Sequence, residues 1–222
     1  MDAAMAAEGA ETRDGGWRDP GFWDGVAAGY AKRRIGDAAA YEEKLRITQA
    51  LLTPQAQVLE LGAGTAMTAV RHAPFAARVH ATDLSEAMLE IGRRRAAEAG
   101  VQNVSFERAS VETLDAAPGA WDAVLAMSLL HLLEDPDAAL RRIHGWVKPG
   151  GVFVSSTVCL GDSHGWLRPV VRVMRWLGKA PPVRFERQDA LLGRIEAAGF
   201  ALERVWRPTS RAAVFAVARR PA

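Results

Sequence analysis

The residues Val58-Leu59-Glu60-Leu61-Gly62-Ala63-Gly64-Thr65-Ala66 decide the fold of this chain. The apolar run Val58–Leu61 predicts a buried strand, and the pattern after Gly64 predicts a short helix over residues 68–73. A strand, a glycine turn and a helix form the unit that binds a nucleotide in an open parallel sheet. Glycine suits this turn because a backbone without Cβ can bend sharply and approach a ligand closely.

The same stretch excludes two common phosphate-binding loops. A dinucleotide fingerprint has glycine three positions after Gly64, where this chain has Met67, and no Gly-Lys-Ser/Thr follows as in a P-loop. The carboxylate of Glu60, just before the turn, would repel a phosphate and attract a cation. These features favour a nucleoside ligand that has no phosphate and carries positive charge, and they disfavour a dinucleotide-dependent oxidoreductase.

A second anchor is Asp83, which ends the next predicted strand, Val79–Thr82. It lies 19 residues after Gly64, close to the spacing of about 20 residues for an acid that binds a ribose. A carboxylate at this position can accept hydrogen bonds from both ribose hydroxyls. The alternative is that Asp83 caps a helix, but Ser85, with Met88 three residues later, is the better cap for the next helix.

Three motifs in order, Glu60–Thr65, Thr82–Ser85 and Lys148–Gly151, resemble the Rossmann-like (class I) S-adenosylmethionine-dependent methyltransferases of the small-molecule type. The resemblance covers roughly residues 22–220. It implies an α/β fold with a three-layer Rossmann-like sheet of about seven strands, mostly parallel with an antiparallel C-terminal hairpin. An N-terminal helical cap and an inserted lid helix complete the expected fold.

Composition is that of an ordinary globular protein. The 222 residues are 49% hydrophobic and 24% charged, with a net charge of +2, so nucleic acid is not required as a partner. One cysteine, Cys159, excludes a disulfide framework and a cysteine-rich zinc site. No apolar run is long enough for a membrane span, and the first residues lack a signal-peptide pattern. We therefore expect a cytoplasmic protein.

The chain is expected to form a single methyltransferase domain over residues 21–222, after a disordered or loose segment at residues 1–20. Residues 21–53 form the N-terminal cap, in which helical spacing predicts two helices, the second over 38–52. The predicted strands of the domain cover residues 58–61, 79–82, 104–107, 121–126, 152–157, 201–207 and 212–218. The remaining predicted helices cover residues 68–73, 85–99, 137–147 and 189–198.

Residues 159–188 form a long insertion before the last predicted helix. Within it Trp166, Val170, Val173, Met174 and Leu177 recur on one side at helical spacing, and basic residues, Arg168, Arg172, Arg175 and Lys179, recur on another. This pattern predicts an amphipathic basic helix. Either it is a lid that packs its apolar side on the core, or residues 166–179 make a peripheral contact with a membrane surface.

The resemblance implies a set of cofactor-binding residues, which are, in chain order, Glu60, Gly62, Ala63, Gly64, Asp83, Leu84, Met88, Ser110, Val111, Ala126 and Met127. Glu60 would face the methionine ammonium, Leu84 and Met88 would enclose the adenine, and Ala126 and Met127 would contribute backbone at the methionine end. The family usually has an acid where this chain has Ser110, whose oxygen would accept from the adenine amine, beside the backbone N–H of Val111.

The cofactor is expected to be S-adenosylmethionine, with S-adenosylhomocysteine as product and without a metal. Methyl transfer from a sulfonium needs alignment and exclusion of water more than catalytic groups. If the acceptor must lose a proton, His131 with Tyr30 or Tyr41 is the candidate base; otherwise these side chains are structural. The other histidines have no metal partners at ligand spacing.

Two classes of function are therefore open: a methyltransferase acting on a small molecule through oxygen, carbon or a small amine, and a non-catalytic S-adenosylmethionine-binding regulatory protein. A variant of the first is an enzyme that methylates a lipid or quinone at a membrane surface. The absence of an Asn-Pro-Pro-Tyr-like motif after residues 121–126 disfavours methylation of nucleic-acid bases or glutamine. The sequence decides neither the acceptor nor the oligomeric state.

Overall fold

The computed structural model describes residues 20–163, 168–177, 180–209 and 212–222. The predicted loose segment lies outside these residues, apart from its last position. The same is true of His164, and of Trp166 and Lys179 at the two ends of the predicted basic helix.

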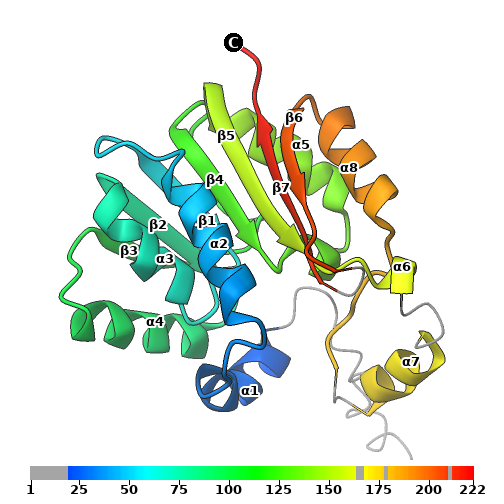
Figure 1. Cartoon of the computed structure of the whole chain (residues 1–222). Coiled ribbons are helices and arrows are strands. Elements are labelled where there is room, and N and C mark those ends of the chain that lie inside the picture. Colours follow the sequence, from blue (N-terminus) through cyan, green and yellow to red (C-terminus); the bar gives the residue numbers. More distant parts are fainter. Residues whose placement is uncertain (1–19, 164–167, 178–179, 210–211) are drawn as a thin grey trace, which may run out of the picture.

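A seven-stranded sheet in the order β3-β2-β1-β4-β5-β7-β6 organises the domain (Figure 1). The first five strands along this order are parallel, whereas β7 pairs antiparallel with both β5 and β6. The strands are β1 (Gln57–Leu61), β2 (Arg78–Asp83), β3 (Val104–Arg108), β4 (Trp121–Met127), β5 (Val147–Thr157), β6 (Ala201–Trp206) and β7 (Val214–Arg219). The predicted mostly parallel sheet with a C-terminal hairpin is confirmed.

Helices cover both faces of this sheet. In Figure 1, α2 and α3 lie in front of it and α5 and α8 lie behind it, which gives three layers. The helices are α1 (Gly21–Ala31), α2 (Ala38–Gln49), α3 (Met67–His72), α4 (Glu86–Glu98), α5 (Pro136–Trp146), α6 (Leu160–Ser163), α7 (Arg168–Trp176) and α8 (Gln188–Ala197), with 3₁₀ turns η1 (Ala73–Phe75) and η2 (Leu130–Leu132).

Short polar side chains start three of these helices, as local chemistry requires. Asp37 and Asp135 each accept a hydrogen bond from a backbone N–H three residues later, at the starts of α2 and α5. The hydroxyl of Ser85 accepts from the N–H of Met88 at 3.1 Å, which confirms the predicted cap of α4. Pro136 then occupies the first turn of α5, where its missing N–H costs nothing.

Two hydrophobic clusters fill the spaces on the two faces of the sheet. One joins the sheet to α5 and α8 and contains Phe153, Leu140 and Ile195; the other joins it to α2 and α3 and contains Phe215 and Val58. These side chains are almost completely buried, and each of them stabilises the fold by about 1.5–3 kcal/mol. The clusters hold the carboxyl ends of the central strands rigidly in place.

Two boundaries differ from the sequence prediction by three residues or more. Strand β5 begins at Val147 rather than residue 152, because Val147 already pairs with Trp121 before a register shift in β4. Gly150, with φ +76°, lies between Val147 and Val152, where this register shift occurs. Helix α2 ends at Gln49, three residues before the predicted end, in hydrogen-bonded turns at Leu51 and Leu52.

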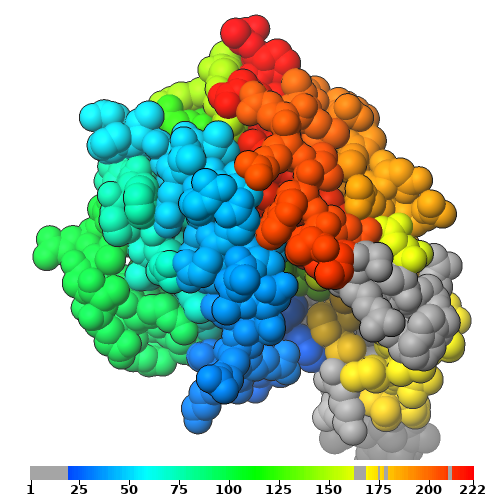
Figure 2. All heavy atoms as spheres, in the orientation of Figure 1, coloured from blue at the N-terminus to red at the C-terminus, as the bar shows by residue number. Residues whose placement is uncertain are grey.

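The inserted helix α7 lies at the lower right of the molecule, coloured yellow in Figure 2. Its apolar side chains at Val170, Val173, Met174 and Trp176 are exposed, Trp176 to 83%. The lid interpretation requires the apolar side of α7 to pack on the core. The exposure of these described side chains shows that it does not. No helix in the described parts of the chain has the length and apolar character needed to cross a membrane.

Candidate active site

A cavity of about 470 Å³ lies at the carboxyl ends of β1, β2, β4 and β5. This is where ligands bind in open α/β sheets. One side, which we call the sheet wall, contains Gly62, Gly64 and Asp83 from the ends of β1 and β2. The other side, the cap wall, comes from α1 and α2 and contains Trp23, Tyr30, Tyr41 and Lys44. The predicted N-terminal cap therefore does border the site.

The glycine turn of the sheet wall has the backbone that only glycine adopts readily. Gly62 has φ +61° and Gly64 has φ +54°. A Cβ atom on Gly62 would also lie 2.8 Å from Cδ1 of Leu129, whereas one on Gly64 would meet no atom within 4 Å. Conformation therefore favours glycine at both positions, and at Gly62 a Cβ atom would also displace the side chain of Leu129.

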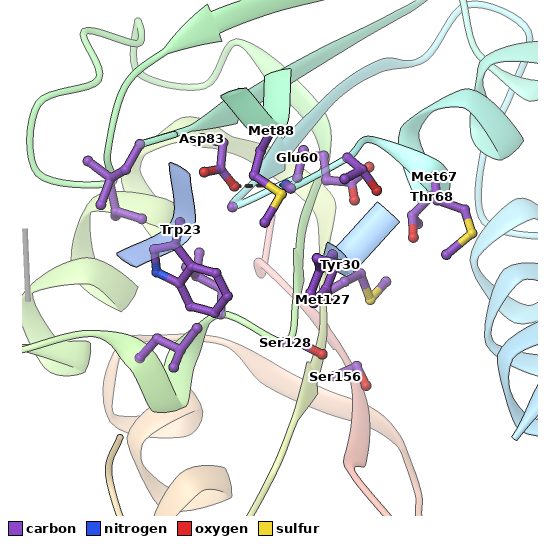
Figure 3. Close-up of a pocket in the computed structure, with 18 of the residues that line it drawn as sticks. Trp23, Tyr30, Glu60, Met67, Thr68, Asp83, Met88, Met127, Ser128 and Ser156 are labelled. Carbon is purple, nitrogen blue, oxygen red and sulfur yellow. Dashed lines mark hydrogen bonds between the residues drawn. The ribbon is translucent and has the colours of Figure 1, made fainter. Parts of the chain in front are cut away.

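Asp83 ties the glycine turn to the end of β2. Its Oδ2 accepts from the N–H of Gly64 at 2.8 Å, and its Oδ1 accepts from the N–H of Ser85 at 2.9 Å; Figure 3 shows the carboxylate beside Met88. Burial raises the pKa of Asp83, and these two bonds oppose that shift. A carboxylate has about four acceptor sites, so two remain for the hydroxyls of a ribose.

Glu60 is a buried carboxyl group in the cavity wall. Burial, assisted by the nearby charge of Asp83, raises its pKa to about 8. Its Oε2 has no hydrogen-bond partner among the described residues. A buried carboxylate without a partner is costly, so the group is largely protonated at neutral pH and a bound cation would restore its charge. This is the chemistry expected of a group that faces an ammonium.

The predicted adenine pocket is only partly as expected. Leu84, Met88, Ser110 and Val111 all line the cavity. However, the Ser110 hydroxyl already accepts from the N–H groups of Glu112 and Thr113, at 3.1 and 3.2 Å. With both lone pairs engaged, it has no acceptor left for an adenine amine. Glu112 lines the cavity beside it, and its carboxylate offers the acceptor that the sequence argument sought at Ser110.

Helix α1 is attached to the start of α4 through Asp24. Its Oδ1 accepts from the Ser85 hydroxyl at 2.5 Å and from the N–H of Ala87 at 3.3 Å. A carboxylate at a helix N-terminus also interacts favourably with the helix dipole. This attachment holds Trp23 and Tyr30, whose rings meet edge to face at 6.5 Å, over the cavity.

The three predicted catalytic residues lie in different surroundings. Tyr30 and Tyr41 line the cavity, but His131, in η2, does not. The Nδ1 of His131 is buried without a partner among the described residues, and burial lowers the pKa of this histidine to about 4. Burial also raises the pKa of Tyr41, so its hydroxyl is a donor at neutral pH. The structure therefore does not bring His131 into the cavity with the two tyrosines, and its role as base stays a prediction.

At the end of β4, only one of the two predicted residues, Ala126 and Met127, lines the cavity. Met127 lines the cavity, while the side chain of Ala126 is buried. The next residue, Ser128, has φ +62°, a conformation that costs a non-glycine residue energy and is concentrated at functional sites. Its N–H donates to the carbonyl of Ser156 at 2.7 Å, which joins the ends of β4 and β5 beneath the cavity.

Sequence reasoning missed several polar residues of the cavity, including Lys44, Thr68, His72 and Ser156. Neither ring nitrogen of His72 has a partner among the described residues, and burial lowers its pKa to about 4. Tyr41 and Lys44 are three residues apart on α2, a spacing that places both on one face. That spacing is the one signal that would have associated Lys44 with the predicted Tyr41. In the described part of the chain, no group of His, Cys, Asp and Glu is arranged to hold a metal ion.

Comparison with known proteins agrees with this geometry. Residues 58–151 match a family described as a methyltransferase domain. The chain is 37% identical over 106 residues, 47% of its length, to a ubiquinone biosynthesis O-methyltransferase from Xanthomonas campestris pv. campestris. This alignment spans 44% of that relative, so the chain matches less than half of the relative's length.

Solved structures show the same fold. An S-adenosylmethionine-dependent methyltransferase from Mesorhizobium loti matches with a TM-score of 0.68 and 24% identity, over 82% of this chain and 98% of that one. The [4+2]-cyclase SpnF matches with a TM-score of 0.67 and 21% identity, over 80% and 81% of the two chains. The fold alone therefore does not decide the reaction. The motifs, the family match over residues 58–151 and the cavity together show that this chain contains a methyltransferase domain with a Rossmann-like fold.

Proposed function

We propose that this chain transfers the methyl group of S-adenosylmethionine to a small-molecule acceptor, most readily through oxygen. The observation that carries the proposal is the combination of Asp83, the glycine turn and the unpartnered carboxyl of Glu60 around one cavity. Together these groups suit a ribose, a close backbone approach and an ammonium. The oxygen acceptor is supported by the name of the relative from Xanthomonas campestris.

The reaction is an in-line displacement. A lone pair of the acceptor attacks the methyl carbon as the carbon–sulfur bond breaks, and the electron pair of that bond stays on sulfur to give the neutral thioether S-adenosylhomocysteine. The cofactor supplies the leaving group. The residues of this chain contribute binding, alignment and exclusion of water: the sheet wall holds the adenosine, and Trp23 and Tyr30 cover the cavity.

Deprotonation of the acceptor is the open step of this proposal. His131 is outside the cavity lining, and Tyr41 is a phenol of raised pKa. We expect His131→Asn to keep methyl transfer within about threefold of the wild type, because a group that takes no proton from the acceptor contributes none of the 10²–10⁴-fold of general base catalysis. A loss of a hundredfold or more in kcat, with an unchanged melting temperature, would instead identify His131 as the base.

Binding and turnover distinguish the enzyme from a non-catalytic regulatory protein. Calorimetry with S-adenosylhomocysteine tests the cofactor site. Incubation with methyl-labelled S-adenosylmethionine and a panel of phenols, catechols and hydroxy acids then tests transfer. Labelled product is expected. Tight binding of the cofactor without label transfer to any acceptor would favour the regulatory protein, and no binding would contradict both.

A lipid or quinone acceptor at a membrane surface is the second candidate, and α7 is the observation that favours it. Val170, Val173 and Trp176 are exposed on a helix that also carries exposed Arg172, as in helices that lie in a membrane interface. The protein should co-sediment with vesicles that contain anionic lipid, and Trp176→Ser should lower the fraction of protein that co-sediments. Equal recovery of wild type and variant with the vesicles would contradict this assignment. The cytoplasmic location stays a prediction.

A further inference from the structure

Lys44 is a cation in the cavity whose partner is neutral. Its Nζ donates to the Ser156 hydroxyl at 2.9 Å, and both residues line the cavity. The described residues contain no carboxylate within 4.0 Å of this ammonium. Lys44 is half-buried and Ser156 is 4% exposed. A partly buried ammonium bound only to a hydroxyl keeps two N–H donors for another ligand.

The surroundings of Lys44 do not neutralise it. Burial lowers the pKa of Lys44, and Asp37 is the charge that opposes this shift. Tyr41, on the same face of α2, adds a buried hydroxyl near Thr68. Groups in this part of the cap wall are therefore donors, in contrast to the carboxyl groups of Glu60 and Asp83 on the sheet side.

Strand order separates Lys44 from the groups expected to hold the cofactor. Asp83 ends β2 and Glu60 lies near the end of β1, while Ser156 lies near the end of β5, beyond β4. Strands lie about 4.8 Å apart, so two strand spacings put β5 roughly 10 Å from β1. In Figure 3, Ser156 and Ser128 lie away from Asp83 and Met88. The carboxylate of the methionine part of the cofactor is bonded to the same carbon as its ammonium, so it must stay close to Glu60.

We propose that Lys44 and Ser156 bind an anionic oxygen of the methyl acceptor, so that the acceptor is a small molecule carrying a carboxylate, phosphate or ionised hydroxyl. The inference rests on the proposed function, because it takes the rest of the cavity as the cofactor site. An acceptor bound in its ionised form would need no general base. Charge-assisted bonds from Lys44 would favour that form.

The test uses the full chain saturated with S-adenosylhomocysteine and three anionic probes: benzoate, 4-hydroxybenzoate and inorganic phosphate. Benzamide and 4-hydroxybenzamide are the neutral counterparts of the two acids. We expect at least one acid to bind ten times or more as tightly as its amide by calorimetry. Lys44→Met should remove this preference, Lys44→Arg should retain part of it, and Ser156→Ala should reduce it less than Lys44→Met does. Lys32→Met, which removes an exposed cation outside the cavity, should leave the preference unchanged.

Three outcomes would overturn the inference. The first is that no anion binds more tightly than its neutral counterpart, and the second is that Lys44→Met keeps the preference while melting as the wild type does. The third is that Lys44→Met binds S-adenosylhomocysteine ten times or more as weakly as the wild type but binds 5′-methylthioadenosine, which lacks the carboxylate, equally well. That result would assign Lys44 to the cofactor. If the wild type binds no S-adenosylhomocysteine at all, the proposed function itself fails.

Discussion

The two walls of the cavity are built by different means. In the sheet wall, the backbone of Gly62 and Gly64 and the bonds of Asp83 to Gly64 and Ser85 fix the geometry within two adjacent βα units. In the cap wall, the side chains that reach the cavity come from α1 and α2, which precede the first βα unit. The sheet wall has a rigid geometry suited to one ligand, and the cap wall has the side-chain variety that suits selection of an acceptor.

Replacing Gly62 should have the largest effect on the sheet wall. Gly62→Ala should lower the free energy of unfolding by about 2 kcal/mol or more. Left-handed strain accounts for about 1–2 kcal/mol of this loss, and the contact at 2.8 Å with Leu129 adds to it. Gly64→Ala is the matched control, because it has the same strain but open space for Cβ. Chemical denaturation of both variants measures the difference. Equal stability would show that packing at Gly62 adds nothing to conformation.

The next effect concerns the acid of the sheet wall. Asp83→Asn should weaken binding of S-adenosylhomocysteine by about 10–100-fold, since hydrogen bonds to a charged group contribute about 1.5–3 kcal/mol. Asp122→Asn is the control: its carboxylate accepts from Gln57 and Lys148 outside the cavity. Calorimetry should show weakened binding in the first variant only. Unchanged affinity of Asp83→Asn for both S-adenosylhomocysteine and adenosine would remove the ribose from Asp83.

These two anchors show what could be predicted from the sequence. The sequence predicts that Gly62, Gly64 and Asp83 lie together, and they do line one cavity, because turn chemistry and a spacing of 19 residues are local properties. Ser110 was assigned the wrong hydrogen-bonding capacity, because its use in a turn with Glu112 and Thr113 depends on the exact backbone conformation.

The cap wall depends on packing between distant segments, which a single sequence does not display. Lys44 meets Ser156 across 112 positions, and Asp24 meets Ser85 across 61. Helical spacing predicted α1 and α2 and their aromatic residues but not these partners. The same limit applies to His131, which follows β4 as predicted yet is buried and does not line the cavity.

The pH dependence of stability and of cofactor affinity would test the role of Glu60 on the sheet side of the cavity. Glu60, with a pKa raised from 4.5 to about 8, stabilises the ligand-free fold in its protonated form; that contribution is complete below pH 4.5 and is lost as the pH rises towards 8. Binding of an ammonium requires the carboxylate, so affinity for S-adenosylhomocysteine should rise over the same interval. In Glu60→Gln both slopes should vanish. A wild-type affinity that is flat between pH 6 and about 8 would contradict the pairing of Glu60 with an ammonium.

The smallest effect is expected where α1 is attached to α4. Asp24→Ala removes an acceptor for Ser85 and Ala87 and should weaken cofactor binding by about threefold to tenfold, for a net bond contribution of about 0.5–1.5 kcal/mol. Amide hydrogen exchange in α1 should become faster. Asp24→Asn keeps an acceptor and should stay closer to the wild type. If exchange in α1 is unchanged in Asp24→Ala, the attachment does not hold the cap in place.

In the proposed function, the sheet wall binds the adenosine of a cofactor with a positively charged methionine end. Calorimetry of the wild-type chain with S-adenosylhomocysteine near pH 8, with NAD as the comparison, tests this binding. We expect saturable heat at one ligand per chain for S-adenosylhomocysteine, displacement by S-adenosylmethionine, and no binding of NAD. Absence of heat with S-adenosylhomocysteine, or tighter binding of NAD, would contradict it.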